Sequence, residues 1–200
     1  MKLEGKNKPV EEQMEILHAI LKEHTKLYQI LKALEKSGLP NYYLAAGCIN
    51  QTVFNYYHDF PLDYGIKDFD IVYFDPDVSY KKEDAWIKIL QNKLGDLKVE
   101  TDIKNEARVP LWYKEKFGKE IKPYYNVEEA ISRWGTTITC LGVRLEKNHL
   151  VVAAPYGLND LFELTIRPVK KGFNEKSYQE KVQKWKKKWP LLKIIAWKDL

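Results

Sequence analysis

The stretch LAAGCIN at residues 44–50 is followed, after a polar loop, by KDFDIVYF at residues 67–74. Residues 42–46 are apolar and end at Gly47, which predicts a buried strand that turns directly into a helix over 49–58. The β-branched and aromatic residues of 69–74 predict a second strand. The chain therefore brings Asp68 and Asp70 to the beginning of an apolar strand.

Asp68 and Asp70 are separated by one residue, so their side chains are expected to project to the same side of the strand. Two neighbouring carboxylates repel each other, whereas Mg²⁺ takes hard carboxylate oxygens and keeps room for waters and phosphates. The pair therefore predicts a metal site. The alternative is a pair of solvated loop acids, because such pairs also occur by chance on surface loops.

A third acid is expected on a later strand, over residues 97–103. Glu100 and Asp102 lie on alternate positions of this segment and share one predicted face. Either could complete the metal site, and periodicity alone does not separate them. A turn that ends a strand at Gly47 and opens a helix also offers backbone N–H groups that could hold a triphosphate.

The remaining pattern predicts a mainly helical chain around these strands. Apolar residues over 11–36 follow a helical repeat that His24 and Thr25 interrupt, which predicts two helices. Further helices are expected over 79–94, 105–117, 126–134 and 174–188, one helical turn over 157–162, and a hairpin from segments 137–146 and 150–153. We expect one domain over 1–200, with a helical segment 1–39, a core 40–170 and a C-terminal helix and tail 171–200.

Composition narrows the class of protein. Of the 200 residues 44% are hydrophobic and 30% charged, and no apolar run approaches the ~20 residues that span a bilayer. No secretory signal is recognisable, so we expect a cytoplasmic protein with no membrane partner. Cys48 and Cys140 lack any paired spacing and are expected to be buried. The net charge of +5 suits a polyanionic partner or simply a solvated lysine-rich face.

Several further segments form an ordered set with the two motifs. They are 45–47, 50–54, 67–75, 102–109, 111–113, 154–162 and 167–168. Over roughly residues 40–197, this set resembles a bacterial group of nucleotidyltransferase-like proteins of the DNA polymerase β-like superfamily. The resemblance implies an α+β nucleotidyltransferase fold: a short mixed β-sheet with flanking helices, plus a C-terminal hairpin and helices.

The resemblance also implies an activity, the transfer of a nucleoside monophosphate from an NTP to an acceptor with Mg²⁺ or Mn²⁺. Asp68 and Asp70 match the acidic pair of the superfamily and Asp102 matches its third acid. These three are the expected catalytic and metal-binding residues. The candidates for binding the nucleotide are Gly47, Cys48, Asn50, Lys67 and Arg108. Arg108 could instead pair with an acid of the fold, and Lys67 could be a surface lysine.

One departure from the superfamily keeps other functions open. Gly-Ser usually follows the first strand, and here Cys48 follows Gly47, so a hydroxyl that often contacts phosphate is absent. The alternatives are an inactive member that binds nucleotide or a partner, and an RNA-binding module that uses the lysine-rich helix over 174–188. The acceptor could be RNA, protein or a small molecule, and the oligomeric state is left open.

Overall fold

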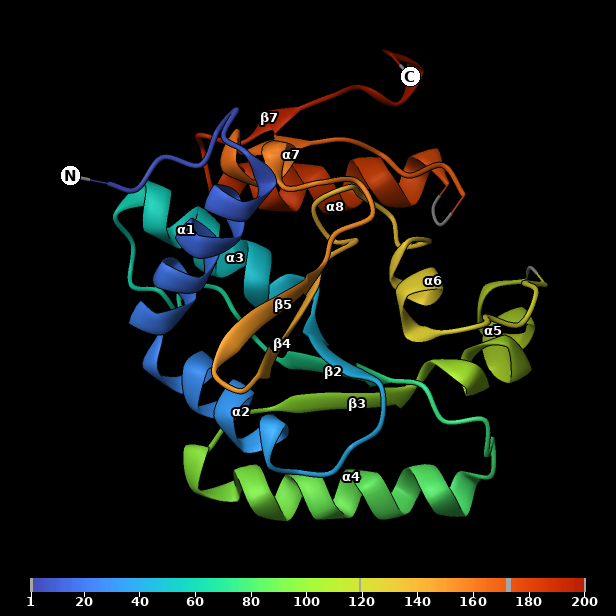
Figure 1. Cartoon of the computed structure of the whole chain (residues 1–200). Coiled ribbons are helices and arrows are strands. Elements are labelled where there is room, and N and C mark those ends of the chain that lie inside the picture. The colour runs from blue at the N-terminus through green and yellow to red at the C-terminus, as the bar shows by residue number, and fades with distance from the viewer. Residues whose placement is uncertain (1, 119, 172–173, 200) are drawn as a thin grey trace.

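The protein is described by a computed structural model that covers residues 2–118, 120–171 and 174–199. Its centre is a five-stranded sheet in the order β3-β2-β1-β4-β5 (Figure 1). The strands are β1 (Tyr42–Ala45), β2 (Phe69–Tyr73), β3 (Thr101–Asn105), β4 (Gly142–Glu146) and β5 (His149–Ala153). Strands β2 and β3 are parallel and the other neighbouring pairs are antiparallel. The short mixed sheet and the β4–β5 hairpin are confirmed.

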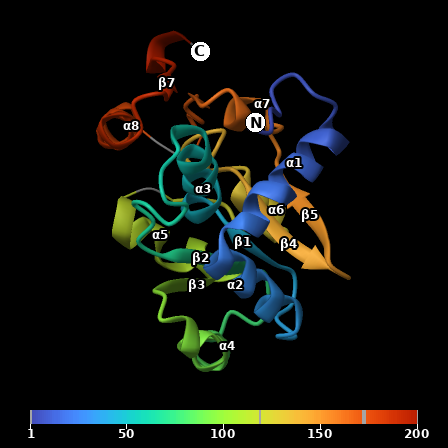
Figure 2. The ribbon, with the colours of Figure 1, turned by 90° about the vertical axis from the view of Figure 1, so that its left-hand side faces the viewer.

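Four helices cover one face of this sheet. They are α1 (Val10–Glu23), α2 (Thr25–Glu35), α3 (Gly47–His58) and α4 (Tyr80–Leu94), and they pack respectively on β5, β4, β2 and β3 (Figure 2). The strands direct Leu44, Ile71, Ile103 and Val143 into the main core beneath them. Side chains alternate along a strand, so the neighbouring residues point to the opposite face.

The opposite face is only partly covered. Tyr43, Ala45 and Val72 pack there against Val127 and Ile131 of the short helix α6 (Val127–Ile131). After β3 the chain forms the 3₁₀ turn η2 (Glu106–Arg108) and helix α5 (Val109–Phe117). Asp70, Asp102 and Lys104 alternate with the core residues, so they project toward this second face.

Local capping explains several helix boundaries. The predicted break between the first two helices is confirmed, because Nδ1 of His24 accepts a hydrogen bond from the N–H of Leu27 at 3.3 Å and caps α2. Ser79 caps α4, and Asn126 caps α6. The helix α8 (Glu175–Lys188) begins at the cap Asn174, whose side-chain oxygen accepts from the N–H of Ser177 at 2.8 Å.

Several sequence expectations differ from the structure. The first strand of the hairpin begins at Gly142 instead of residue 137, and the helix expected over 126–134 ends at Ile131. The third strand begins at Thr101 instead of residue 97, because Gly95–Leu97 form the 3₁₀ turn η1 and Lys98 adopts a left-handed φ of 49°. A second, two-stranded sheet was not predicted: β6 (Thr165–Ile166) pairs in parallel with β7 (Lys193–Ile194). Strands of two residues carry too little periodicity to be recognised.

The C-terminal part packs against α3. The remaining elements are α7 (Asn159–Phe162), α8, and the 3₁₀ turn η3 (Trp197–Asp199). The buried indole N–H of Trp189 donates to Oδ1 of Asn55 at 2.7 Å, and Phe54 contacts the rings of Trp185 and Trp189 edge-on. These contacts fix α8 next to α3. Within the described residues, no helix has the length and apolar character needed to cross a membrane.

Candidate active site

The turn between β1 and α3 lies beside the acidic residues. Ala46 has a φ of 51°, a left-handed value that is strained for a residue with a Cβ. A Cβ added at Gly47 would lie 3.0 Å from Nε2 of Gln51 and 3.9 Å from Oδ2 of Asp70. Because Gly47 has no side chain, the backbone at the start of α3 lies close to the carboxylate of Asp70.

Asp70 and Asp102 face each other across two neighbouring strands. They are direct register partners in the parallel pair β2–β3, so their side chains leave the sheet on the same face. Asp68 is exposed in the loop just before β2. Burial raises the pKa of Asp70 to about 6, and the negative charges of Asp68 and Asp102 add to the rise, while Lys104 and Lys181 oppose it. The carboxylates of Asp68 and Asp102 are therefore close enough to act electrostatically on Asp70.

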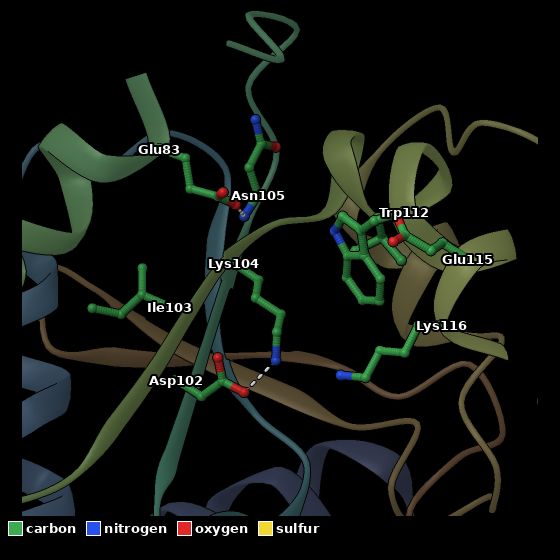
Figure 3. Close-up of a pocket in the computed structure, with 9 residues that line it drawn as sticks. Glu83, Asp102, Ile103, Lys104, Asn105, Trp112, Glu115 and Lys116 are labelled. Carbon is green, nitrogen blue, oxygen red and sulfur yellow. Dashed lines mark hydrogen bonds and ion pairs between the residues drawn. The ribbon is translucent and has the colours of Figure 1, made fainter. Parts of the chain in front are cut away.

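Lys104 supplies a positive charge to this cluster. Its ammonium group forms an ion pair with the carboxylate of Asp102, two residues earlier on the same strand (Figure 3). In this arrangement no group of three or more His, Cys, Asp or Glu side chains in the described part of the chain is placed to hold a metal ion. The donors are nevertheless all carboxylate oxygens, the ligands that Mg²⁺ and Mn²⁺ prefer. The negative charges that act on Asp70 favour a bound cation. Such a cation would replace the ammonium group of Lys104 as the partner of Asp102.

Asp70 and Asp102 line a cavity of about 420 Å³ on the partly covered face of the sheet. Three cationic side chains besides Lys104 also line it: Lys116, Arg133 and Lys181. Lys181 belongs to α8 and reaches the cavity because that helix is fixed against α3. Burial lowers the pKa of Lys181, and the negative charge of Asp70 acts in the opposite direction. The cavity therefore combines acids with several cations, as a site for a metal-bound polyphosphate requires.

Aromatic side chains form another part of the cavity wall. They are Trp112, Tyr113, Tyr124 and Trp134. Tyr124 is 9% exposed and packs against Val109 and Ala130, while the guanidinium of Arg133 lies 5.8 Å from the centre of its ring. Flat aromatic faces of this kind can stack on a nucleobase.

Glu106 lines the same cavity immediately after β3 and is only 4% exposed. Burial raises its pKa to about 8; the charges of Asp70, Asp102 and Glu83 add to this rise, and Lys104 counteracts it. A carboxyl buried among other acids is uncommon in a structure unless it has a role or a partner.

A second cavity, of about 620 Å³, adjoins the first (Figure 3). The two share Asp102, Lys104, Val109, Trp112 and Lys116, while Glu83, Asn105 and Glu115 line only the second. The acidic end of β3 therefore opens to space on two sides. Such an arrangement has room for a nucleotide and for a second reactant next to Asp102.

The nucleotide-binding candidates from the sequence occupy different environments. Gly47 lies beside Asp70, as described above. Cys48 is fully buried and its thiol donates to the carbonyl of Ala45 at 3.3 Å, so its side chain does not line the cavity. Asn50 is also fully buried, and its side-chain amide has no hydrogen-bond partner among the described residues. Lys67 is exposed and lines neither cavity.

Arg108 lines neither cavity. It forms an ion pair with Glu83 at 2.6 Å, with both side chains largely buried, and lies over the ring of Tyr80. The sequence left open whether Arg108 binds the nucleotide or pairs with an acid of the fold, and the structure shows the ion pair. The other open choice concerned Glu100, which is exposed, immediately precedes β3 and lines neither cavity. Asp102 is the acid that faces Asp70.

Glu106, Arg133 and Lys181 were not singled out as site residues by sequence reasoning. A signal existed for Glu106, since it continues the alternation of Asp102 and Lys104 along the strand. Lys181 was noted only as part of a lysine-rich helix, and nothing local in the sequence connects it to Asp70.

The comparisons with known proteins concern the family and the fold. A family model described as nucleotidyltransferase matches residues 32–194. An NMR structure described as revealing a CCA-adding enzyme head domain has a TM-score of 0.73 and 25% sequence identity, and the match covers 91% of this chain and 95% of that one. The comparison with curated proteins gives no match.

Proposed function

The chain belongs to the nucleotidyltransferase family, and on this basis we propose that it transfers a nucleoside monophosphate from an NTP to an acceptor by using Asp68, Asp70 and Asp102 to hold Mg²⁺ or Mn²⁺. The observation that carries this proposal is the register of β2 and β3. Asp70 stands directly opposite Asp102 on the face of the sheet that opens into the cavity.

In this proposal each group of residues that lines the cavity has its own role. Divalent cations held by the three acids would neutralise the triphosphate and stabilise the charge that develops during displacement at the α-phosphorus. Lys181, Lys116 and Arg133 bind the phosphate oxygens of the NTP. The start of α3 lies beside Asp70, and its backbone N–H groups would supply the phosphate contact that a hydroxyl after Gly47 would otherwise make. The buried thiol of Cys48 takes no part.

The second cavity is the place for the acceptor. It shares Asp102 and Lys104 with the nucleotide cavity, so an acceptor hydroxyl bound there can approach the α-phosphorus beside the acids. In-line displacement requires the attacking and leaving oxygens on opposite sides of the phosphorus.

The proposal is tested with NTPs labelled at the α-phosphate, each with Mg²⁺ or Mn²⁺, against RNA, protein and small hydroxyl compounds as acceptors. We expect label to reach one acceptor class, and Asp70→Asn to abolish the transfer. Asp96→Asn is the matched control, because Asp96 is exposed in η1 and lines neither cavity. Transfer that persists in Asp70→Asn contradicts the mechanism. Tight NTP binding with no transfer to any acceptor favours the inactive, nucleotide-binding alternative.

A further inference from the structure

Lys104 occupies a carboxylate that the proposed metal site needs. Its ammonium group pairs with Asp102, and in Figure 3 its side chain extends from β3 toward that carboxylate. The charge of Lys104 also acts on two other acids of the cavity: burial raises the pKa of Asp70 and of Glu106, and Lys104 opposes the rise at both. Lys104 is therefore an internal counterion for this group of acids.

The ion pair between Lys104 and Asp102 can be exchanged at small cost. The two side chains are 38% and 41% exposed, and exposed pairs of this kind contribute little to stability because water screens the attraction. A lysine ammonium group is carried on a flexible four-carbon chain, so it can move without a change in the backbone. A divalent cation has twice the charge and binds carboxylate oxygens directly, so it can displace the ammonium group from Asp102.

Lys104 lines both cavities, together with Asp102. In the proposed function the triphosphate of the NTP lies beside Asp70 and Asp102. An ammonium group released from Asp102 would then be close to negatively charged phosphate oxygens, with which it forms a strong, charge-assisted hydrogen bond. Without a nucleotide the released ammonium group gains no such partner and is repelled by the bound cation. The nucleotide therefore determines whether the exchange is favourable.

We propose that Lys104 changes partner when the substrates bind: it leaves Asp102 to a divalent cation and binds a phosphate oxygen of the NTP instead. This inference rests on the function proposed above. Metal and nucleotide then bind cooperatively, because the nucleotide supplies the partner that the displaced ammonium group has lost. Lys104 thus disfavours a metal ion without a nucleotide, and it joins the residues that contact the substrate.

The test measures two affinities of the full chain by calorimetry. One is for Mn²⁺ alone, and the other is for a nonhydrolysable NTP with saturating Mn²⁺, with the analogues of ATP, CTP, GTP and UTP used in turn. Lys104→Met removes the charge and keeps most of the length of the side chain; Lys104→Gln removes the charge but keeps a polar end. Lys88→Met is the matched control, because it breaks an ion pair with Asp84 at 2.6 Å and neither residue lines either cavity.

The two affinities should change in opposite directions. Lys104→Met and Lys104→Gln are expected to bind Mn²⁺ alone about three- to tenfold more tightly, because the competing ammonium group is gone. They should bind the NTP about tenfold more weakly, because a hydrogen bond between charged groups is lost. Lys88→Met should match the unaltered protein in both measurements.

Weaker or unchanged binding of Mn²⁺ alone in both Lys104 variants overturns the inference. Tighter Mn²⁺ binding with an unchanged NTP affinity also overturns it, because Lys104 would then be a counterion that never reaches the phosphates. In both cases the proposed function stands, since the unaltered protein still binds metal and nucleotide. If the unaltered protein binds neither, the proposed function itself fails and this inference fails with it.

Discussion

Asp70 of β2 and Asp102 of β3 are direct partners in the one parallel strand pair of the five-stranded sheet. Parallel pairing puts both side chains on the same face at the same level. Burial, followed by the charges of Asp68 and Asp102, raises the pKa of Asp70 to about 6. The sheet therefore holds together carboxylates that repel each other in the absence of a cation.

The first prediction concerns divalent cations and pH. A cation must compete with a proton at Asp70, so Mn²⁺ should bind weakly at pH 5 and progressively more tightly as the pH rises through about 6. Thermal unfolding with and without Mn²⁺ measures this: the increase in Tm should be larger at pH 8 than at pH 5. An increase that is the same at both pH values would show that Asp70 is not a ligand.

The second prediction concerns stability without ligands. The native pKa of Asp70 (about 6 against 3.8) and of Glu106 (about 8 against 4.5) are both raised. The native protein therefore binds more protons than the unfolded chain between about pH 4 and 8, and its free energy of unfolding should fall as the pH rises across that window. Glu106→Gln cannot ionise, so it should lose less stability between pH 5 and 8.5. Urea unfolding at the two pH values compares the losses, and equal losses in both proteins would refute the assignment.

The third prediction concerns the attachment of α8. Trp189→Phe removes the indole N–H that Oδ1 of Asn55 accepts inside the protein, which should lower the free energy of unfolding by about 1–3 kcal/mol. Trp86→Phe is the matched control, because the buried indole N–H of Trp86 has no partner among the described residues. Removing it should cost less. Denaturant unfolding of both variants separates the hydrogen bond from the loss of ring area.

The fourth prediction concerns Lys181. Lys181→Met removes a cation that lines the cavity with Asp70, and NTP affinity should fall by about tenfold, the usual effect of losing a hydrogen bond to a charged group. Lys184→Met, at an exposed position on the same helix, should bind NTP normally. Calorimetry gives both affinities. An equal loss in the two variants would indicate a general charge effect on α8.

The sequence predicted the local parts of the site well. The strand–turn–helix at Gly47 is local and was predicted. The expected strand alternation of Asp68 and Asp70 was not found, because β2 begins at Phe69 and Asp68 lies in the loop before it. The choice between Glu100 and Asp102 was different, because it depends on the register of β3 against β2. The 3₁₀ turn at Gly95–Leu97 moves the strand by several residues, and only tertiary structure fixes that register.

The positions of the remaining residues relative to the cavity depend on packing between segments that are far apart in the sequence. Lys181 enters the cavity because Trp189 and Phe54 fix α8 on α3, a contact between segments far apart in the sequence. Arg108, a plausible phosphate ligand by residue type, turns instead to Glu83 of α4. Glu106 was not singled out from the sequence, and its burial in the cavity wall depends on the packing of the segments that follow β3.

Binding of Mn²⁺ together with a nonhydrolysable NTP tests the central claim most directly. Calorimetry should show tight, metal-dependent nucleotide binding for the unaltered protein and for Asp96→Asn, and a loss of roughly 100-fold or more for Asp70→Asn and Asp102→Asn. If both of these variants bind the metal–nucleotide complex as tightly as the unaltered protein, the facing carboxylates of β2 and β3 are not the metal site.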